Sequence, residues 1–282
     1  MRAVKEKAYA KINLYLDVVG VREDGFHNIK SVMHSISLCD KLTIEAFLSD
    51  KTEIEIVHDS SELSNDKDNL IYKSALKYLT EYGLDACVKI TLEKNIPIGA
   101  GLGGGSSDAA ATLRGLNRIF KCADRETLLK LSAEIGSDVP FCLIGGTAMC
   151  EGRGEILTPL NIDFKRHFVV AIGDSRVSTP KAYRDLDERF NYNFITRSNN
   201  EPDFETLYNV FEEVITISEI NEIKENMIKS GAEKALMSGS GPSVFGIYEN
   251  EESARLAVES LQKLGFKAYY ATSVEVSKVD SI

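Results

Sequence analysis

Residues 97–111 of the chain are PIGAGLGGGSSDAAA, a run in which glycine fills five of the seven positions from 99 to 105. A loop without Cβ atoms lets backbone N–H groups approach a bulky anion closely. A helix is expected to start near Ser106, and it would point its unpaired N–H groups and the positive end of its dipole at the same place. The run therefore predicts a phosphate-binding loop. The candidate nucleotide-binding residues are Pro97, Ile98, Gly99, Ala100, Gly101, Leu102, Gly103, Gly104, Gly105, Ser106 and Ser107.

The sequence of this loop fits some phosphate loops better than others. Gly99, Gly101 and Gly104 match the dinucleotide fingerprint, but a second helix, and not a strand, is expected after the first. Asp124, at about the distance of a ribose-binding carboxylate, is expected to cap that second helix instead. No Gly-Lys-Ser/Thr follows the glycines and no His-Arg-Asp or Asp-Phe-Gly occurs downstream, which excludes a Walker loop and a protein kinase loop. A plain turn is disfavoured because five glycines lose much backbone entropy on folding.

Hydrophobic patterns around the loop indicate strands and helices in a mixed order. Strict alternation at 12–18 predicts a half-buried strand. In the first half we further expect strands at 41–46, 52–57, 87–93, 145–151 and 155–159, and helices at 69–82, 106–120 and 124–136. In the second half we expect strands at 168–172 and 266–274, helices at 203–215, 218–229, 250–264 and from Thr179-Pro180 onward, and an exposed loop at 197–201. This order favours an α+β fold over a doubly wound parallel sheet.

The composition is that of an ordinary globular chain and argues against several classes of protein. The 282 residues are 43% hydrophobic and carry a formal net charge of −10, which argues against nucleic-acid or acidic-membrane partners. No uncharged apolar run approaches roughly 18 residues, and charges interrupt the N-terminal segment, so neither a membrane span nor a secretion signal is expected. The five cysteines form no Cys-x-x-Cys pair, so neither a disulfide framework nor a zinc site is expected, and a cytoplasmic protein is favoured.

Four further segments resemble the motifs of one superfamily. They are Ala10–Leu14 (AKINL), Asp24–His27 (DGFH), Gly136–Phe141 (GSDVPF) and Ser238–Ser243 (SGSGPS). Together with the glycine run, in order and over nearly the whole chain, they resemble the GHMP kinase superfamily, which includes galactokinase, homoserine kinase and mevalonate kinase. The resemblance implies two α+β domains with the active site between them. Residues 1–160 would form an ATP-binding domain like ribosomal protein S5 domain 2, and residues 161–282 a ferredoxin-like domain.

The resemblance also implies an activity and a co-substrate. It implies an ATP-dependent kinase that phosphorylates an alcohol. The motifs are most similar to those of members that phosphorylate the 2-hydroxyl of a cytidine diphosphate-linked methylerythritol in non-mevalonate isoprenoid precursor biosynthesis. ATP would be the co-substrate and Mg²⁺ its counter-ion, held largely by phosphate and water. The sequence identifies no magnesium ligands. A monomer or homodimer is expected, without nucleic-acid or membrane partners.

The resemblance assigns Asp138 as the general base and Lys11 as its partner. Asp138 follows a Gly-Ser break and precedes Val-Pro-Phe, which suggests a partly buried carboxylate that needs a cation to stay ionised. Without the resemblance, an Asx-turn and a solvated strand-edge lysine would be the favoured interpretations. Of Ser106 and Ser107, we expect one to cap the helix and the other to contact phosphate or a metal.

The remaining candidates concern the acceptor. Asn13 shares a strand face with Lys11 and would reach the substrate. The resemblance places Phe26 and His27 at the cytosine, with Phe26 stacking and His27 hydrogen-bonding, although relatives commonly carry tyrosine where this chain has Phe26. Tyr183 would be the second face of that sandwich, or a core residue.

Thr179 would donate to the pyrimidine or the diphosphate. The segment 238–243 either lies near the phosphate loop or only joins a helix to a strand. Two alternative functions stay open: a kinase for another small alcohol such as mevalonate or homoserine, and a non-catalytic nucleotide-binding protein. The aromatic candidates disfavour the first alternative, and the intact Lys11 and Asp138 disfavour the second.

Overall fold

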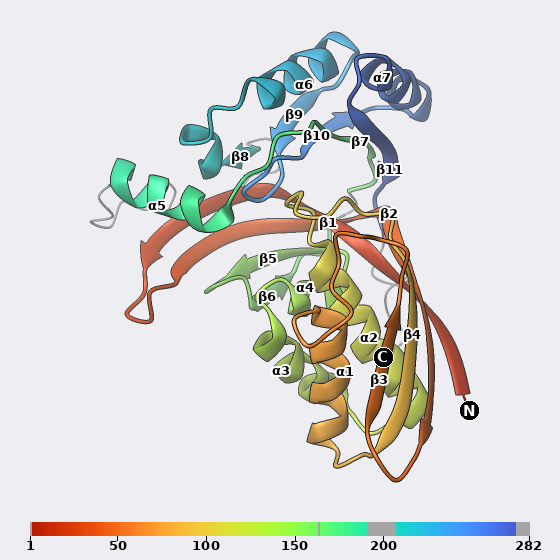
Figure 1. The fold of residues 1–282 in the computed structure, drawn as a ribbon. Helices are drawn as coiled ribbons and strands as arrows, with labels where there is room; N and C mark the ends of the chain where they lie inside the picture. Colours follow the sequence, from red (N-terminus) through yellow and green to blue (C-terminus); the bar gives the residue numbers. More distant parts are fainter. Residues whose placement is uncertain (1, 163, 191–206, 275–282) are drawn as a thin grey trace.

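The computed structural model describes residues 2–162, 164–190 and 207–274, which form two β-sheets, and a long hairpin of the larger sheet packs against the smaller one (Figure 1). The hairpin consists of β1 (Arg2–Val21) and β2 (His27–Leu48) and is much longer than the predicted strands at 12–18 and 41–46. Most of β2 before Asp40 is buried on both faces, so polarity does not alternate there and the pattern gives no strand signal.

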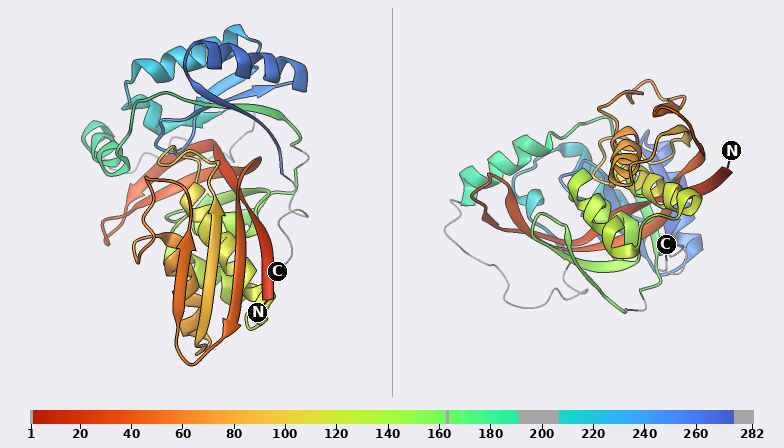
Figure 2. Two further views of the ribbon diagram at one scale, coloured as in Figure 1. Left: turned by 45° about the vertical axis from the view of Figure 1, so that its right-hand side comes forward. Right: turned by 90° about the horizontal axis from the view of Figure 1, so that it is seen from below.

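The large sheet has the strand order β3-β4-β2-β1-β8, and β5 and β6 extend it from β2. Its other strands are β3 (Glu53–Val57), β4 (Ala86–Glu93), β5 (Thr147–Glu151), β6 (Ile156–Pro159) and β8 (Tyr208–Asn209). One face is covered by α1 (Leu70–Glu81), α2 (Gly104–Phe120), α3 (Arg125–Ile135) and α4 (Val139–Ile144), as Figure 2 shows. Asn69 caps α1 and Asp124 caps α3, which confirms the predicted starts of these two helices.

The small sheet is antiparallel, with the order β11-β7-β10-β9. Its elements are β7 (His167–Ile172), α6 (Ser218–Lys229), β9 (Lys234–Met237), β10 (Val244–Tyr248), α7 (Glu251–Lys263) and β11 (Lys267–Thr272). This βαββαβ order is that of a ferredoxin-like unit, and the predicted α+β class is confirmed. The predicted domain boundary near residue 160 falls between β6 and β7. The later strand β8 pairs with β1 of the large sheet. The division into two domains at residue 160 stays a prediction.

The hairpin lies between the two units. Ile12 and Leu14 of β1 belong to the same buried cluster as Phe168, Val170 and Phe245 of the small sheet. The small sheet therefore covers one face of β1 while the α1–α4 layer covers the large sheet from the other side (Figure 1). Any side chain near the middle of β1 sits at the junction of the two units.

Two segments differ from the prediction. The described part of the expected helix 203–215 is β8 followed by a 3₁₀ helix, Val210–Glu213, so the helix prediction is wrong there. Asn209 is buried and donates to the carbonyls of Met237 and Gly239, a tertiary contact that overrides the local pattern. The helix α4 was not predicted, because all six of its residues are buried and show no periodicity. The expected loop at 197–201 lies outside the described residues.

The helix α5 (Thr179–Phe190) projects beside the tip of the hairpin and carries Tyr183 (Figure 1). It begins one residue earlier than expected, because the N–H of Ala182 donates to the carbonyl of Ser178. None of the helices in the described part of the chain is long and apolar enough to cross a bilayer.

Candidate active site

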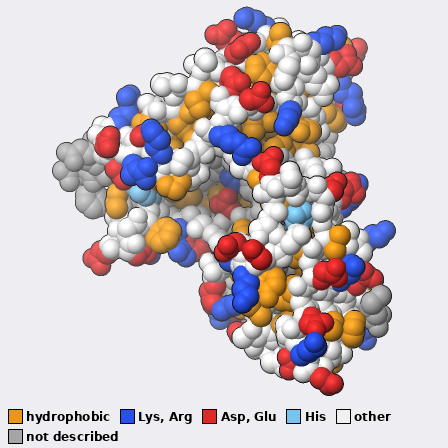
Figure 3. Space-filling view, in the orientation of Figure 1, with side chains coloured by type: hydrophobic (Ala, Val, Ile, Leu, Met, Phe, Trp, Pro, Cys, Tyr) orange, Lys and Arg blue, Asp and Glu red, His pale blue; other side chains and the backbone are white. Residues whose placement is uncertain are grey.

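A cavity of about 630 Å³ lies where the glycine loop, β1, the hairpin tip and α5 meet. It is visible as a hollow near the centre of the face in Figure 3. All seven predicted catalytic and acceptor residues line it: Lys11, Asn13, Phe26, His27, Asp138, Thr179 and Tyr183. Gly101 and Gly103 of the glycine loop line it as well, so segments far apart in the sequence converge on one site.

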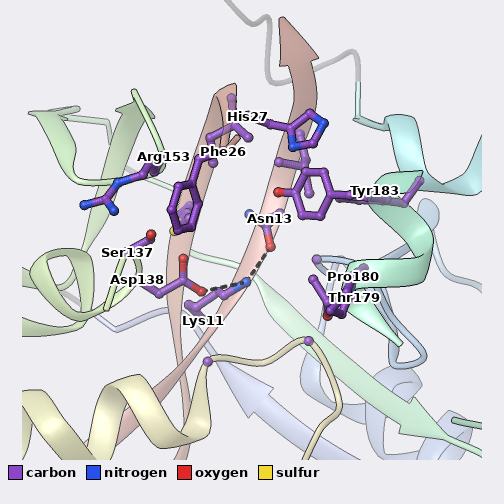
Figure 4. A pocket seen from close by; sticks show the side chains of 18 of the residues that line it. Lys11, Asn13, Phe26, His27, Ser137, Asp138, Arg153, Thr179, Pro180 and Tyr183 are labelled. Atoms are coloured by element: carbon purple, nitrogen blue, oxygen red, sulfur yellow. Dashed lines mark hydrogen bonds and ion pairs between the residues drawn. The ribbon is translucent and has the colours of Figure 1, made fainter. Parts of the chain in front are cut away.

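Lys11 and Asp138 face each other at the floor of this cavity (Figure 4). Lys11 Nζ lies 3.5 Å from Asp138 Oδ2, with side-chain exposures of 5% and 29%. Lys11 is therefore buried, and not on a solvated strand edge. Asp138 is the N-cap residue of α4, yet its side chain makes no capping hydrogen bond, which leaves the carboxylate directed at Lys11 and the cavity. Lys11 and Asp138 therefore form an ion pair that lines the cavity.

A short chain of hydrogen bonds orients Asn13 toward Lys11. Lys11 Nζ donates to Asn13 Oδ1 at 2.8 Å, Asn13 Nδ2 donates to Ser31 Oγ at 2.8 Å, and Ser31 Oγ donates to the Tyr15 carbonyl at 2.7 Å. The contact with Ser31 fixes which side of the amide faces the lysine. Sequence reasoning missed Ser31, because its position depends on the register between β1 and β2.

The glycine loop makes contacts that a side chain would prevent. Gly101 has φ +77°, and a Cβ there would lie 2.2 Å from the carbonyl oxygen of Ser238. Gly103 has φ +68°, and a Cβ there would lie 2.8 Å from Lys11 Cγ. The N–H of Lys11 donates to the Leu102 carbonyl at 2.9 Å, so the loop is attached to the strand that carries the lysine.

The segment 238–243 lies directly against this loop. Ser238 Oγ donates to the Gly101 carbonyl at 3.0 Å, and Ser243 Oγ donates to the Ala100 carbonyl at 2.5 Å. Thr179 Oγ1 lies 2.7 Å from Ser240 Oγ and connects α5 to the same segment. Of the two interpretations left open by the sequence, the one that places this segment next to the glycine loop is therefore confirmed.

Neither predicted serine caps α2. The helix begins two residues before Ser106, with Gly103 as its N-cap residue in the left-handed region, so the capping prediction is wrong. Ser107 is buried and its hydroxyl donates to the Tyr9 carbonyl, which ties α2 to β1. Ser106 is half-buried and remains the candidate for contact with phosphate or a metal.

The aromatic candidates surround the upper part of the cavity. Figure 4 shows Phe26 and Tyr183 on opposite sides, above Lys11 and Asp138. Phe26 is 53% exposed, and the Arg153 guanidinium lies 5.1 Å from its ring centroid.

Tyr183 stacks on His27, with ring centroids 4.5 Å apart, and meets Phe211 edge-on at 5.0 Å. It therefore both packs in the core and lines the cavity. Burial raises the pKa of Tyr183 to about 12, with a further contribution from the negative charge of Asp138, so its hydroxyl stays protonated. His27 Nε2 lies 2.8 Å from Asp187 Oδ1. Asp187, like Arg153, was missed by sequence reasoning, because only the fold brings it to the hairpin tip.

The first residues of the glycine loop line a second cavity, of about 380 Å³. Pro97, Ile98 and Gly99 line it, together with Lys94, residues of the 173–176 segment and Tyr269. Different residues of the loop therefore line the two cavities. Among the described residues, no group of three or more His, Cys, Asp or Glu could hold a metal ion, and all five cysteines are free thiols.

Comparison with known proteins agrees with this geometry. The family profile of the GHMP kinases N terminal domain matches residues 69–146, and that of the GHMP kinases C terminal domain matches residues 197–267. The chain is 41% identical to the 4-diphosphocytidyl-2-C-methyl-D-erythritol kinase of Macrococcus caseolyticus, over 92% of this chain and 95% of that protein. It is 39% identical to the kinase of the same name from Clostridium perfringens, over 95% and 97%.

Solved structures give the same picture. A crystal structure of 4-(cytidine 5'-diphospho)-2C-methyl-D-erythritol kinase superposes with a TM-score of 0.80 and 34% identity, covering 95% of this chain and 98% of that one. Homoserine kinase from Cytophaga hutchinsonii superposes with a TM-score of 0.69 at 19% identity, covering 98% and 95%, a likeness that concerns the fold alone.

Proposed function

Because the chain belongs to the GHMP kinases, and among them to the family of 4-diphosphocytidyl-2-C-methyl-D-erythritol kinases, we propose that it phosphorylates the 2-hydroxyl of that cytidine diphosphate-linked alcohol with ATP. The reaction belongs to non-mevalonate isoprenoid precursor biosynthesis. The observation that carries the proposal is the Lys11–Asp138 pair, which lies in a cavity bounded by the glycine loop on one side and by aromatic side chains on the other.

Asp138 acts as the general base. Its carboxylate takes the proton of the acceptor hydroxyl while that oxygen forms a bond to the γ-phosphorus of ATP and the bond from the γ-phosphorus to the bridging oxygen of ADP breaks. Lys11 pairs with this carboxylate and offsets negative charge on the transferring group. Asn13, held by Ser31, orients the Lys11 ammonium.

The glycine loop binds the donor. Its backbone N–H groups and the N-terminus of α2 attract the ATP phosphates. ATP brings Mg²⁺, which neutralises phosphate charge. Ser106 is our candidate for contact with a phosphate oxygen or the metal. The two cavities, which are lined by different residues of the loop, support a donor next to Pro97 and an acceptor next to Lys11.

The aromatic residues select the acceptor. Phe26 and Tyr183 provide two faces for the cytosine, and His27 hydrogen-bonds its edge. Phe26 retains the stacking surface of the tyrosine that is common in relatives but lacks its hydroxyl. Thr179 donates to the pyrimidine or the diphosphate. We further propose a cytoplasmic enzyme, monomeric or homodimeric, whose two domains meet near residue 160.

A coupled assay of ADP release tests the acceptor. The purified protein is given ATP and Mg²⁺ with 4-diphosphocytidyl-2-C-methyl-D-erythritol, and in separate reactions with mevalonate or homoserine. We expect turnover with the first alone. Turnover only with mevalonate or homoserine would assign the other acceptor class, for which a clamp of aromatic residues has no use. ADP release with none of the three would contradict the proposal.

A further inference from the structure

A buried ion cluster lies at the ends of the glycine loop, and its lysine, Lys94, also lines the second cavity. Lys94 Nζ is 2.5 Å from Asp40 Oδ2 and 2.6 Å from Asp108 Oδ2. The three side chains are 6%, 0% and 4% exposed. Burying three ionisable groups together is expensive unless they pair closely, so their placement at this point calls for an explanation.

The cluster joins three elements at the two ends of the loop. Asp40 is on β2, and its Oδ1 accepts from the N–H groups of Asn95 and Ile96 at 2.6 and 2.7 Å, where the loop begins. Asp108 is on α2, where the loop ends. The Lys94 ammonium connects the two carboxylates and lies so close under the first turn of α2 that a Cβ on Gly104 would be 3.1 Å from it.

A loop this rich in glycine has many accessible conformations, and ordering it on ligand binding reduces affinity. Fixing both of its ends before the ligand arrives removes part of that entropy loss. We propose that Lys94, Asp40 and Asp108 are positioning residues that hold the glycine loop in its nucleotide-binding conformation, and that they act on the affinity for ATP and not on the acceptor.

The charge of the cluster is compatible with an anion nearby. Two carboxylates and one ammonium would leave a negative charge beneath a phosphate site. Burial raises the pKa of Asp108 well above the ordinary carboxyl range, more than the Lys94 ammonium lowers it. Asp108 Oδ1 has no hydrogen-bond partner among the described residues and is a place for the proton. With Asp108 neutral, Lys94 and Asp40 balance each other.

Three variants test the proposal. Lys94→Met removes the ammonium and keeps an unbranched side chain that is one atom shorter. Asp108→Ala removes the link to α2 but leaves the Lys94–Asp40 pair. Asp108→Asn is the matched control, because it keeps an oxygen within reach of Lys94 and resembles the neutral acid in shape and charge. The far-UV circular dichroism of each variant is compared with that of the wild type to establish folding.

Two measurements are made without any acceptor. The dissociation constant of a non-hydrolysable ATP analogue with Mg²⁺ is determined by titration calorimetry, and hydrogen–deuterium exchange is followed in peptides covering 95–103 and, as a reference, 244–248. We expect about a tenfold weaker affinity and faster exchange at 95–103 in Lys94→Met and Asp108→Ala, with 244–248 unchanged, and less than about a threefold change in Asp108→Asn.

Asp108→Ala is the decisive variant, because Lys94 lines the second cavity and Asp108 is not among the residues that line it. An affinity within twofold of the wild type in folded Asp108→Ala would overturn the proposal. So would faster exchange spread equally over both peptides, because that pattern indicates general loosening. If Lys94→Met does not fold, Asp108→Ala decides, since it removes fewer contacts. The inference rests on the proposed function only in that ATP is the donor. If the acceptor assay fails, the measurements of ATP-analogue affinity and hydrogen exchange still test it.

Discussion

Acid should destabilise this protein through one buried histidine. His34 on β2 is 2% exposed. Its Nδ1 lies 2.8 Å from Thr147 Oγ1 and its Nε2 lies 3.0 Å from Ser273 Oγ, while the rings of Phe164 and Phe168 pack against it. Ser273 directly follows β11, so the imidazole connects the large sheet to the small one. Burial lowers the pKa of His34 from 6.5 to about 3.

The sign and size of the effect follow from linkage. In the unfolded chain His34 binds a proton as the pH falls below 6.5, whereas in the folded protein it stays neutral until about pH 3. The unfolded state therefore binds more protons, and the free energy of unfolding decreases as the pH falls from about 6.5 toward 3. At pH 5 the two pKa values give a loss of about 2 kcal/mol relative to neutral pH, from His34 alone.

The measurement is urea unfolding followed by far-UV circular dichroism at pH 7 and pH 5. His34→Gln replaces the imidazole with a neutral polar side chain that has no proton to gain. The wild type should lose about 2 kcal/mol more than His34→Gln between the two pH values. Thr147→Val is the matched control: it removes a hydrogen-bond partner but keeps the buried imidazole, so it should keep the steep acid dependence. Equal losses in the wild type and His34→Gln would refute the reasoning.

Three further predictions concern the site. Asp138→Asn should fold and bind ATP while kcat falls by about 10²–10⁴-fold, because the base is lost; full turnover in the ADP-release assay would refute its role. Gly101→Ala should weaken ATP affinity, because its Cβ would lie 2.2 Å from the carbonyl oxygen of Ser238. The control is Gly83→Ala, where the backbone also has a positive φ of +58° but an added Cβ would meet no atom within 4 Å. It should lower only the melting temperature. Phe26→Ala should raise KM for the acceptor about 5- to 150-fold and leave KM for ATP unchanged. The control is Phe47→Ala, at a phenylalanine that is also exposed but does not line the cavity, and it should change neither KM.

Several of the elements that the sequence predicted have one face exposed to water, although β7, which is buried on both faces, was also predicted from its apolar run. The alternation in 87–93 predicted β4, and the amphipathic pattern of 69–82 predicted α1, because each element has one polar face. Burial on all sides removes that contrast, which is why α4 and much of β2 went unrecognised. At 207–215 the apolar spacing suggested a helix, but the buried amide of Asn209 binds the backbone near Met237 instead.

The residues of the site likewise fall into those that the sequence predicted and those that it did not. Its seven catalytic and acceptor candidates are short-range signals, each contained in a motif of a few residues, and the structure brings all seven to one cavity. Ser31, Asp187 and Arg153 belong to no such motif. Each acts on a motif residue through a contact that only strand register or the approach of α5 creates. A sequence pattern can name the groups that do the chemistry, but it does not contain the contacts that orient them.

The glycine loop also explains why donor and acceptor effects can be separated by experiment. Its residues Leu102 and Gly103 contact the acceptor site. The Lys11 amide donates to the Leu102 carbonyl, and the Lys11 side chain packs on Gly103. The ends of the loop are held by Lys94, which contacts no residue of the acceptor candidates. A change at Gly103 therefore moves the lysine that faces Asp138 and must affect both substrates. A change at Lys94 acts at the ends of the loop and in the second cavity, which Lys94 lines, so its effect on the acceptor depends on how rigidly β1 holds Lys11. Because Lys11 is also fixed by Asn13, that coupling is weak, and the two KM values should respond differently to the two sites.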